Sequence, residues 1–200
     1  MTEKEKGALG MLYDANNDAE LQGEYMDASL LLFDYNRTLP IEEAVRQSIL
    51  KELLGKIGKG CILRPPFYCD RGYNIELGDS VFANFNFVVL DGCKVTIGNH
   101  VYIAPNVGIY TAGHPFDVAL RRKGLEYAYP VSIGNDVWIG AGVSILPGVH
   151  IGNNVVIGAG SVVNRDIPDN SLAVGNPCKV IRHLEACSCP QFYEERIVNK

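Results

Sequence analysis

One histidine stands in a stretch of sequence suited to an exposed loop. His114 lies between Gly113 and Pro115 in the run Thr111-Ala112-Gly113-His114-Pro115. Gly113 frees the backbone before it, and Pro115 biases His114 towards extended conformations. Histidine side chains titrate near pH 6.5, so a neutral imidazole could take a proton from a reacting group at pH 7. The residues alone leave a second interpretation open, in which His114 is a solvent-facing side chain at a loop tip.

A six-residue repeat identifies the structure that must position His114. The repeat begins at residue 133 and continues for 36 residues, with Gly at the second position of four of its six units. This period predicts a β-helix, in which three short strands make one triangular coil and the coils stack as parallel sheets. The aliphatic first positions should point inward and stack from coil to coil: Ile133, Ile139, Ile145, Ile151, Ile157 and Val163.

The repeat fails where His114 lies. A weaker copy precedes the gap, and 24 residues separate Ile109 from Ile133, which is a multiple of six. The coil should therefore resume in phase after the interruption. A long insert without repeat character in a compact solenoid is usually functional. We expect a loop over residues 111–130, extruded from a β-helix that covers residues 58–185.

Residues 1–57 predict a small helical cap. A second helix is expected from Pro40, with Ile41, Val45 and Ile49 on its apolar stripe. The first helix is indicated by apolar residues that recur at spacings of three and four: Leu21, Tyr25, Ala28, Leu32 and Tyr35.

Histidine and cysteine spacing does not suggest a metal centre. A zinc site would need imidazoles that converge from neighbouring coils, and the inserted loop spoils the register of His114 and His150. The six cysteines form no CxxC pair. Cys187 and Cys189 lie close together in a C-terminal tail of residues 186–200, but lack the further ligands of structural zinc. We therefore expect no metal, and reduced thiols.

The composition excludes several classes of protein. Hydrophobic residues make up 47% of the 200 residues and charged residues 20%, which is typical of a globular domain. The net charge of −5 argues against a general nucleic-acid binder, because such a protein needs a basic surface. No apolar stretch approaches the roughly 18 residues of a membrane span, and the charged N-terminus does not resemble a secretory signal. We expect a cytoplasmic protein without nucleic-acid or membrane partners.

Several motifs together resemble the maltose/galactoside O-acetyltransferase family, over about residues 5–185. They are the hexapeptides, the Thr111–Pro115 loop, Tyr13-Asp14-Ala15-Asn16, Ala83-Asn84-Phe85-Asn86, Val137-Trp138-Ile139-Gly140 and Gly175-Asn176-Pro177-Cys178-Lys179-Val180-Ile181-Arg182. The resemblance implies a mainly β protein, a left-handed parallel β-helix with an N-terminal helical cap. It also implies a homotrimer with active sites between subunits, acetyl-CoA as co-substrate and a sugar acceptor of the maltose or glucose type.

The resemblance further implies roles for individual residues. His114 matches the family's catalytic histidine, which would act as a general base in direct transfer without a covalent intermediate. Asp70 stands where the galactoside enzyme has a serine, and Asp91 is the only acid where that enzyme has two. The acceptor would be bound by Asp14, Asp70, Asn84, Asp91 and Glu126. Acetyl-CoA would be bound by Ala141, Ala159, Asn164, Arg165, Lys179 and Arg182, with the Ala141 amide as the oxyanion donor.

Two other function classes remain open at this point. A non-catalytic β-helix that binds a partner explains the repeat, but neither the loop histidine nor the basic residues near the last coil. A related acetyltransferase that acts on an antibiotic or an amino sugar shares the repeat and the histidine, but such relatives usually lack the Tyr-Asp-Ala-Asn segment.

Overall fold

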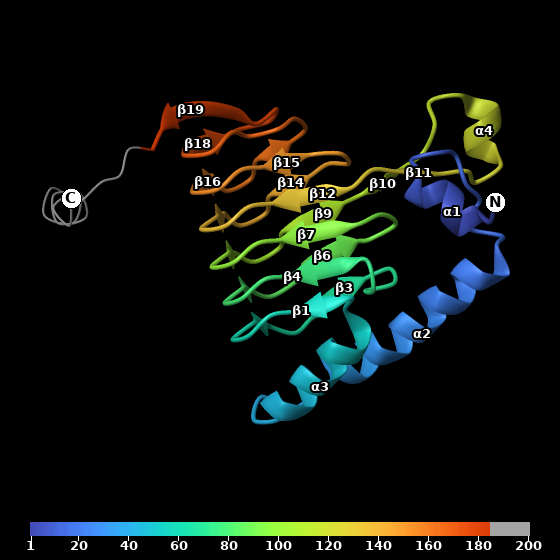
Figure 1. The fold of residues 1–200 in the computed structure, drawn as a ribbon, viewed down its shortest axis with the longest axis horizontal. Coiled ribbons are helices and arrows are strands. Elements are labelled where there is room, and N and C mark those ends of the chain that lie inside the picture. Colours follow the sequence, from blue (N-terminus) through green and yellow to red (C-terminus); the bar gives the residue numbers. More distant parts are fainter. Residues whose placement is uncertain (185–200) are drawn as a thin grey trace, which may run out of the picture.

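Three parallel sheets run along the molecule, as the six-residue period predicts (Figure 1). The computed structural model describes residues 1–184. Sheet 1 contains β1 (Lys56–Ile57), β4 (Ile75–Leu77), β7 (Val95–Ile97), β12 (Val131–Ile133) and β15 (His150–Ile151). Sheet 2 contains β2 (Ile62–Leu63), β5 (Phe82–Ala83), β8 (Tyr102–Ile103), β13 (Trp138–Ile139), β16 (Val155–Ile157), β18 (Ser171–Val174) and β19 (Lys179–His183). Sheet 3 contains β3 (Phe67–Cys69), β6 (Phe87–Leu90), β9 (Gly108–Tyr110), β14 (Ser144–Ile145) and β17 (Val162–Val163).

Each coil passes through sheets 1, 2 and 3 in that order and therefore turns three corners. We name them the 1–2, 2–3 and 3–1 corners. Within these three sheets, the described strand pairs between coils are parallel, and β19 folds back antiparallel on β18. The coil repeat shortens along the β-helix, from 20 residues between Ile75 and Val95 to 18 between Ile133 and Ile151 and 16 between Ile151 and Ile167.

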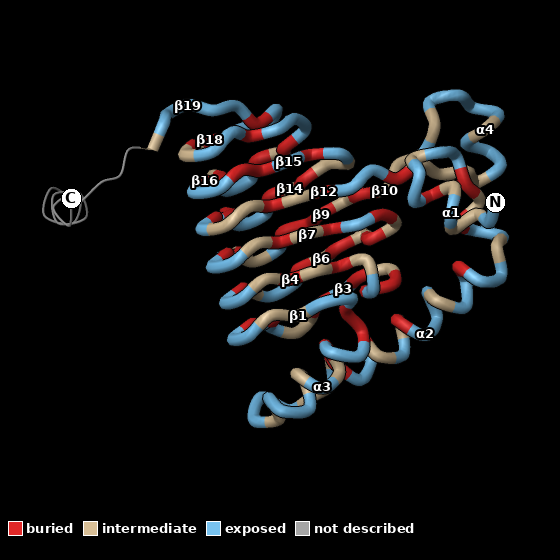
Figure 2. Tube along the Cα trace, viewed as in Figure 1, coloured by how far each residue is buried: buried red, intermediate tan, exposed pale blue. Residues whose placement is uncertain are grey.

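Buried residues, red in Figure 2, recur in every coil of the β-helix. Their aliphatic side chains form one column in its interior. Ile139 pairs in register with Ile103 below and Ile157 above, and none of the three is more than 1% exposed. The six predicted inward positions are all buried, which confirms the prediction. Since one coil cannot enclose its own apolar residues, stability depends on this stacking.

Helices close the foot of the β-helix and its flank (Figure 1). They are α1 (Glu3–Ala8), α2 (Ala19–Asn36) and α3 (Glu43–Leu53). Leu50 of α3 and Tyr35 of α2 are fully buried against the first coil, where the Tyr35 hydroxyl donates to the Leu63 carbonyl. β1 begins inside the range 1–57 that was assigned to the cap.

Two details of the helical prediction are wrong. The helix expected from Pro40 begins at Glu43, because the Leu39 amide donates to the Glu42 side chain at 2.7 Å and closes a turn there. Ile41 is consequently 88% exposed instead of lying on a buried stripe, and Val45 is also exposed. Tyr25 is half-exposed on the flank of α2, whereas the other four residues of its predicted face are buried.

The expected loop leaves the β-helix at the 3–1 corner and keeps the coil in phase. Its arms, β10 (Ala112–Gly113) and β11 (Tyr127–Ala128), pair antiparallel, and α4 (Val118–Arg122) lies at its tip. Ile133 still pairs with Ile97, one coil below. None of the helices within residues 1–184 is long and apolar enough to cross a membrane.

Candidate active site

The Tyr-Asp-Ala-Asn segment lies against the loop that carries His114. Tyr13 and Glu126 exchange two backbone hydrogen bonds of 3.0 Å, so the N-terminal chain extends the β10–β11 ribbon by one more antiparallel partner. The Asn16 side chain donates to the Gly124 carbonyl at 2.8 Å. Tyr13 is buried in a small apolar cluster of its own, beside the ends of the loop. The segment therefore fixes the loop from outside the β-helix.

A backbone carbonyl in the same loop orients His114. The exposed His114 ring places Nδ1 3.0 Å from the Leu125 carbonyl oxygen. Since a carbonyl can only accept, Nδ1 must carry the hydrogen when this bond forms. The neutral ring then has its lone pair on Nε2, the nitrogen that can take a proton. Leu125 adjoins Glu126, so the strand that Tyr13 holds also holds the histidine.

Asp14 follows Tyr13 and stays ionised. Its carboxylate accepts hydrogen bonds of 3.0 to 3.1 Å from the side chain and backbone of Asn17. These bonds from Asn17 hold the pKa of Asp14 below its ordinary value. Its backbone amide donates to Glu3 of α1 at 2.6 Å. Asp14 is thus a fixed, half-exposed acceptor on the side of the molecule where the loop begins.

Two further acids lie at the 3–1 corner, below the loop. Asp91 is fully buried, and its Oδ1 accepts from the backbone amides of Asp70 and Arg71 at 3.0 and 2.9 Å. Asp70 is half-buried, and its carboxylate accepts no hydrogen bond within residues 1–184. Burial, together with the Asp91 carboxylate, raises the pKa of Asp70 to about 6. Asp70 is consequently the acid that can face a ligand, and Asp91 is the acid that holds the corner.

Residue Arg71 is part of this corner and was missed by sequence reasoning. Its side chain is 8% exposed, and its Nε lies 3.8 Å from a Glu24 oxygen on α2. Glu24 also accepts from the Tyr73 hydroxyl at 2.7 Å. Among the described side chains, Nε of Arg71 and Oδ2 of Asp91 are buried without hydrogen-bond partners. An arginine after Asp70 gave no sequence signal, because its burial depends on α2 lying across it.

The small residues predicted to contact acetyl-CoA lie at a different corner. Ala141 and Ala159 are exposed at the 2–3 corner of successive coils, and Gly160 donates to the Ala141 carbonyl at 2.8 Å. Within residues 1–184 the Ala141 amide makes no hydrogen bond, so it can donate to a ligand. Gly142 follows with φ +68°, a left-handed conformation that glycine adopts without strain. Asn84 lies at the same corner, after β5.

The predicted basic residues are exposed near the last coils. Arg165 follows Asn164 after β17, whereas Lys179 and Arg182 lie on β19. None of the three cations forms an ion pair within the described part of the chain. Free guanidinium and ammonium groups of this kind suit phosphate. Cys187 and Cys189 lie outside the described residues.

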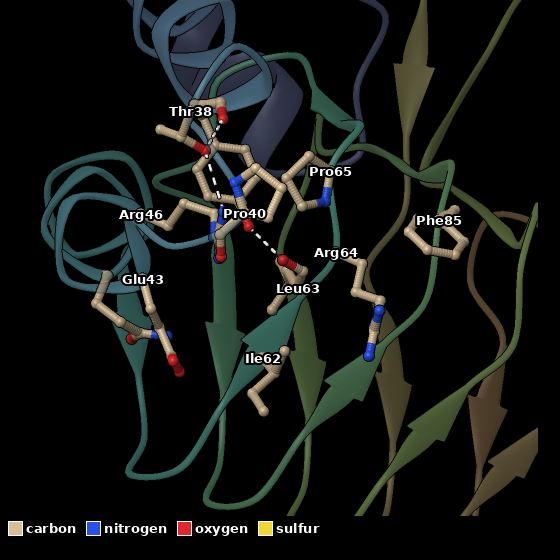
Figure 3. A pocket seen from close by; sticks show the side chains of 11 residues that line it. Thr38, Pro40, Glu43, Arg46, Ile62, Leu63, Arg64, Pro65 and Phe85 are labelled. Atoms are coloured by element: carbon tan, nitrogen blue, oxygen red, sulfur yellow. Dashed lines mark hydrogen bonds between the residues drawn. The ribbon is translucent and has the colours of Figure 1, made fainter.

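Neither of two cavities found within residues 1–184 is lined by His114. One of about 550 Å³ lies between the start of α3 and the first coil, where Arg46 donates to Thr38 (Figure 3). Arg46 also donates to the Leu39 carbonyl. This cavity reaches Phe85, next to Asn84. A second, of about 480 Å³, lies between α2 and β3 and includes Asp70. Within residues 1–184, no group of three or more potential ligands is placed to hold a metal ion.

The single chain therefore assembles its predicted residues in two separate groups. His114, Asp14, Glu126, Asp70 and Asp91 belong to the 3–1 corner and its loop. Asn84, Ala141 and Ala159 belong to the 2–3 corner, and the basic residues lie above. The Leu125 carbonyl that orients His114 could not be found from sequence, since every residue has a carbonyl.

Comparisons with known proteins agree with this geometry. Residues 7–58 match the maltose acetyltransferase hexapeptide capping motif, and residues 130–165 match six bacterial transferase hexapeptides. A putative acetyltransferase of Saccharomyces cerevisiae is 58% identical over 175 residues, 88% of this chain and 89% of that protein. The galactoside O-acetyltransferase of Escherichia coli is 47% identical over 77% of this chain and 76% of its own length. This chain belongs to the hexapeptide-repeat acetyltransferases.

Solved structures of this family superpose closely on the chain. A maltose O-acetyltransferase from Clostridium difficile has a TM-score of 0.91 and 52% identity, covering 92% of this chain and 98% of its own. A galactoside acetyltransferase in complex with coenzyme A has a TM-score of 0.90 and 42% identity, covering 92% of each chain. The β-helix predicted from the repeat and the acetyltransferase family implied by the resemblance are thus confirmed.

Proposed function

We propose that this acetyltransferase moves the acetyl group of acetyl-CoA to a hydroxyl of a maltose- or glucose-type sugar, with His114 as the general base. The names of its relatives support a sugar acceptor, and the relative solved with coenzyme A supports the donor. The observation that carries the proposal is the bond from His114 Nδ1 to the Leu125 carbonyl, because it leaves Nε2 free to accept a proton.

The proposed reaction needs no covalent enzyme intermediate. His114 Nε2 takes the hydroxyl proton while the sugar oxygen attacks the thioester carbonyl. The resulting tetrahedral intermediate collapses, the carbon–sulfur bond breaks, and His114 returns the proton to the departing thiolate. The products are the acetyl ester and free CoA. General base catalysis of this kind contributes about 10²–10⁴-fold to a rate.

Residues of the 2–3 corner suit the donor. The unbonded Ala141 amide is placed to stabilise the oxyanion of the tetrahedral intermediate, and Gly142 beside it leaves room for a close approach. Arg165, Lys179 and Arg182, which form no ion pair within residues 1–184, offer cations for the phosphates of CoA. Asn84 lies at this corner too and would contact the acceptor from the side opposite His114.

The reacting groups meet, in this proposal, between two copies of the chain. Within one chain, His114 extends from the 3–1 corner and Ala141 lies at the 2–3 corner, so one sheet of the prism separates them. A neighbouring copy would place its 2–3 corner beside this loop. Repeated around a threefold axis, this heterologous contact closes as a homotrimer with three sites. A cytoplasmic location fits this proposal, because acetyl-CoA is available there and the four described cysteines are all free.

The test is His114→Ala, assayed by release of free thiol from acetyl-CoA with glucose, maltose, a galactoside, glucosamine and chloramphenicol as acceptors. We expect turnover of the preferred sugar to fall about 10²–10⁴-fold, while the dissociation constant of acetyl-CoA stays within about twofold. His114→Gln, which keeps a polar side chain without a usable base, should be equally slow. Full turnover in either variant would refute the role of His114, and absence of transfer to every acceptor would favour a binding scaffold.

A further inference from the structure

A groove between α2 and β3 has the lining of a binding site, and Asp70 is the one lining residue to which the preceding sections give a role. Its volume of about 480 Å³ lies within the range of small-molecule sites. We call it the α2–β3 groove. It is lined by Tyr25, Ser29, Leu32, Phe33, Asn36, Arg37, Tyr68, Cys69, Asp70 and Leu90.

The walls of the groove are aromatic. Tyr25, Phe33 and Tyr68 are 47%, 56% and 50% exposed, although each has a ring that a folded chain would ordinarily bury. Tyr68 stands on β3, the edge strand of sheet 3, and the other two stand on α2. Flat, half-exposed rings on facing walls can stack on the apolar faces of flat or puckered ring compounds.

The two ends of the groove carry unused polar groups of opposite kind. The Asp70 carboxylate accepts no hydrogen bond, and the Arg37 guanidinium donates none, within residues 1–184. Arg37 is held over the Phe33 ring, with its central carbon 4.8 Å from the ring centre. Sugar rings combine apolar faces with hydroxyls that both donate and accept. They would therefore satisfy the aromatic walls, the free acceptor and the free donors together.

The geometry of α2 gives the groove a direction. Asn36 clamps the helix to β3 by exchanging two hydrogen bonds of 2.9 Å with the Phe67 backbone. At the other end, Glu24 contacts Arg71 and Tyr73 beyond the end of β3. The helix thus runs antiparallel to the strand, and Tyr25 to Asn36 spans about 16 Å. Asp70 is at the Tyr25 end, and Arg37 is at the far end.

The Asp70 end of the groove adjoins the candidate acceptor site. The Asp91 carboxylate holds the Asp70 backbone, and Glu126 is close enough for its charge to act on Asp70. Glu126 follows Leu125, which orients His114. The groove therefore begins where an acceptor bound at the 3–1 corner would lie, and leads away from the reacting hydroxyl.

We propose that the α2–β3 groove binds the sugar units that follow the acetylated ring of a glycoside acceptor. This inference rests on the proposed function, since it assigns an acceptor subsite to the same reaction. Tyr68 and Phe33 would stack on the second and third rings, and Arg37 would donate to their hydroxyls. The acceptor class is accordingly an oligosaccharide or extended glycoside, with a free monosaccharide as a weaker substrate.

Acceptor length tests the proposal. We expect KM of the full chain to fall about tenfold from glucose to an α- or β-linked glucose trisaccharide, with kcat unchanged. Tyr68→Ala and Phe33→Ala should abolish this dependence and leave the kinetics on glucose as they are. Tyr68→Phe retains the ring and should retain most of the effect. Met26→Ala and Leu30→Ala remove exposed apolar side chains of α2 outside the groove and serve as matched controls.

Two outcomes would overturn the groove assignment. One is a KM for both trisaccharides equal to that for glucose, and the other is a length dependence that survives Tyr68→Ala and Phe33→Ala. If no sugar is acetylated at all, the proposed function fails, and calorimetric binding of the two trisaccharides still decides the groove. Binding that weakens about tenfold in Tyr68→Ala would then support it, and the absence of binding would refute it.

Discussion

The chemistry of individual residues depends on neighbours that are distant in sequence. His114 was recognisable from its Gly and Pro flanks, but its useful tautomer is set by the carbonyl of Leu125. Sequence reasoning assigned both Asp70 and Asp91 to the acceptor, yet one faces a cavity and the other supports a corner from within. The types of residue can therefore suggest the reaction. Which of two aspartates faces a cavity and which one supports the backbone follows only from packing.

The first prediction at this scale concerns Asp70. Its pKa of about 6 lies above the ordinary value of 3.8, so the folded state binds more protons than the unfolded state between those values. Stability should therefore fall as pH rises through this window, and the loss should be complete above pH 6. Asp70→Asn, which forfeits no hydrogen bond, should gain up to about 2 to 3 kcal/mol at pH 7.5 and almost nothing at pH 4.

Urea unfolding at the two pH values measures this difference. Asp27→Asn, on the exposed face of α2, is the matched control, because it removes one charge away from the corner. An Asp70→Asn protein that is less stable than the parent at pH 7.5 would contradict the account. So would a gain of the same size at pH 4.

At the scale of elements, the corners are held by a ladder of side-chain amides. Asn154 and Asn170 adopt positive φ at the corners, a conformation that asparagine tolerates better than most residues. A second role was not foreseen. At the 1–2 corner, Asn135 Oδ1 accepts the Asn99 amide at 2.8 Å, and Asn153 Oδ1 accepts the Asn135 amide at 2.9 Å. Each side chain thus binds the backbone one coil below it.

This ladder predicts a specific loss of stability. Asn135→Ala would leave the Asn99 amide without its acceptor and should lower the free energy of unfolding by about 1 to 2 kcal/mol. Thermal unfolding followed by circular dichroism would measure it. Asn164→Ala provides the comparison, since the Asn164 side chain makes no hydrogen bond within residues 1–184. Equal unfolding temperatures for the two variants would show that the ladder contributes nothing.

The helices show what periodicity can and cannot predict. The spacing of Leu21, Ala28 and Leu32 correctly gave the buried face of α2. Tyr25 shares that spacing but is half-exposed and lines the α2–β3 groove. The start of α3 was missed because a Glu42 side chain closes the preceding turn. The spacing of apolar residues shows which face of a helix is buried. Where the helix begins depends on polar contacts of single side chains, which the spacing does not show.

At the scale of the whole molecule, the repeat predicted nearly the entire architecture. The six-residue period and the length of the insert predicted that the coils stack in register on both sides of the loop. The pairing of Ile133 with Ile97 confirms this prediction. The separation of His114 from Ala141 was not predictable, because it depends on which corner releases the loop. That separation is the reason to place the reaction between copies of the chain.

Subunit complementation tests this central claim most directly. The parents are His114→Ala, which lacks the base, and Ala141→Phe, which blocks the exposed 2–3 corner; each alone should be nearly inactive. Differently tagged copies would be coexpressed at equal levels, unfolded and refolded together, and mixed oligomers would be isolated through both tags. If every site combines a loop from one copy with a corner from its neighbour, each doubly tagged trimer regains one of its three sites, about one third of wild-type activity. Doubly tagged oligomers as inactive as their parents would contradict the account.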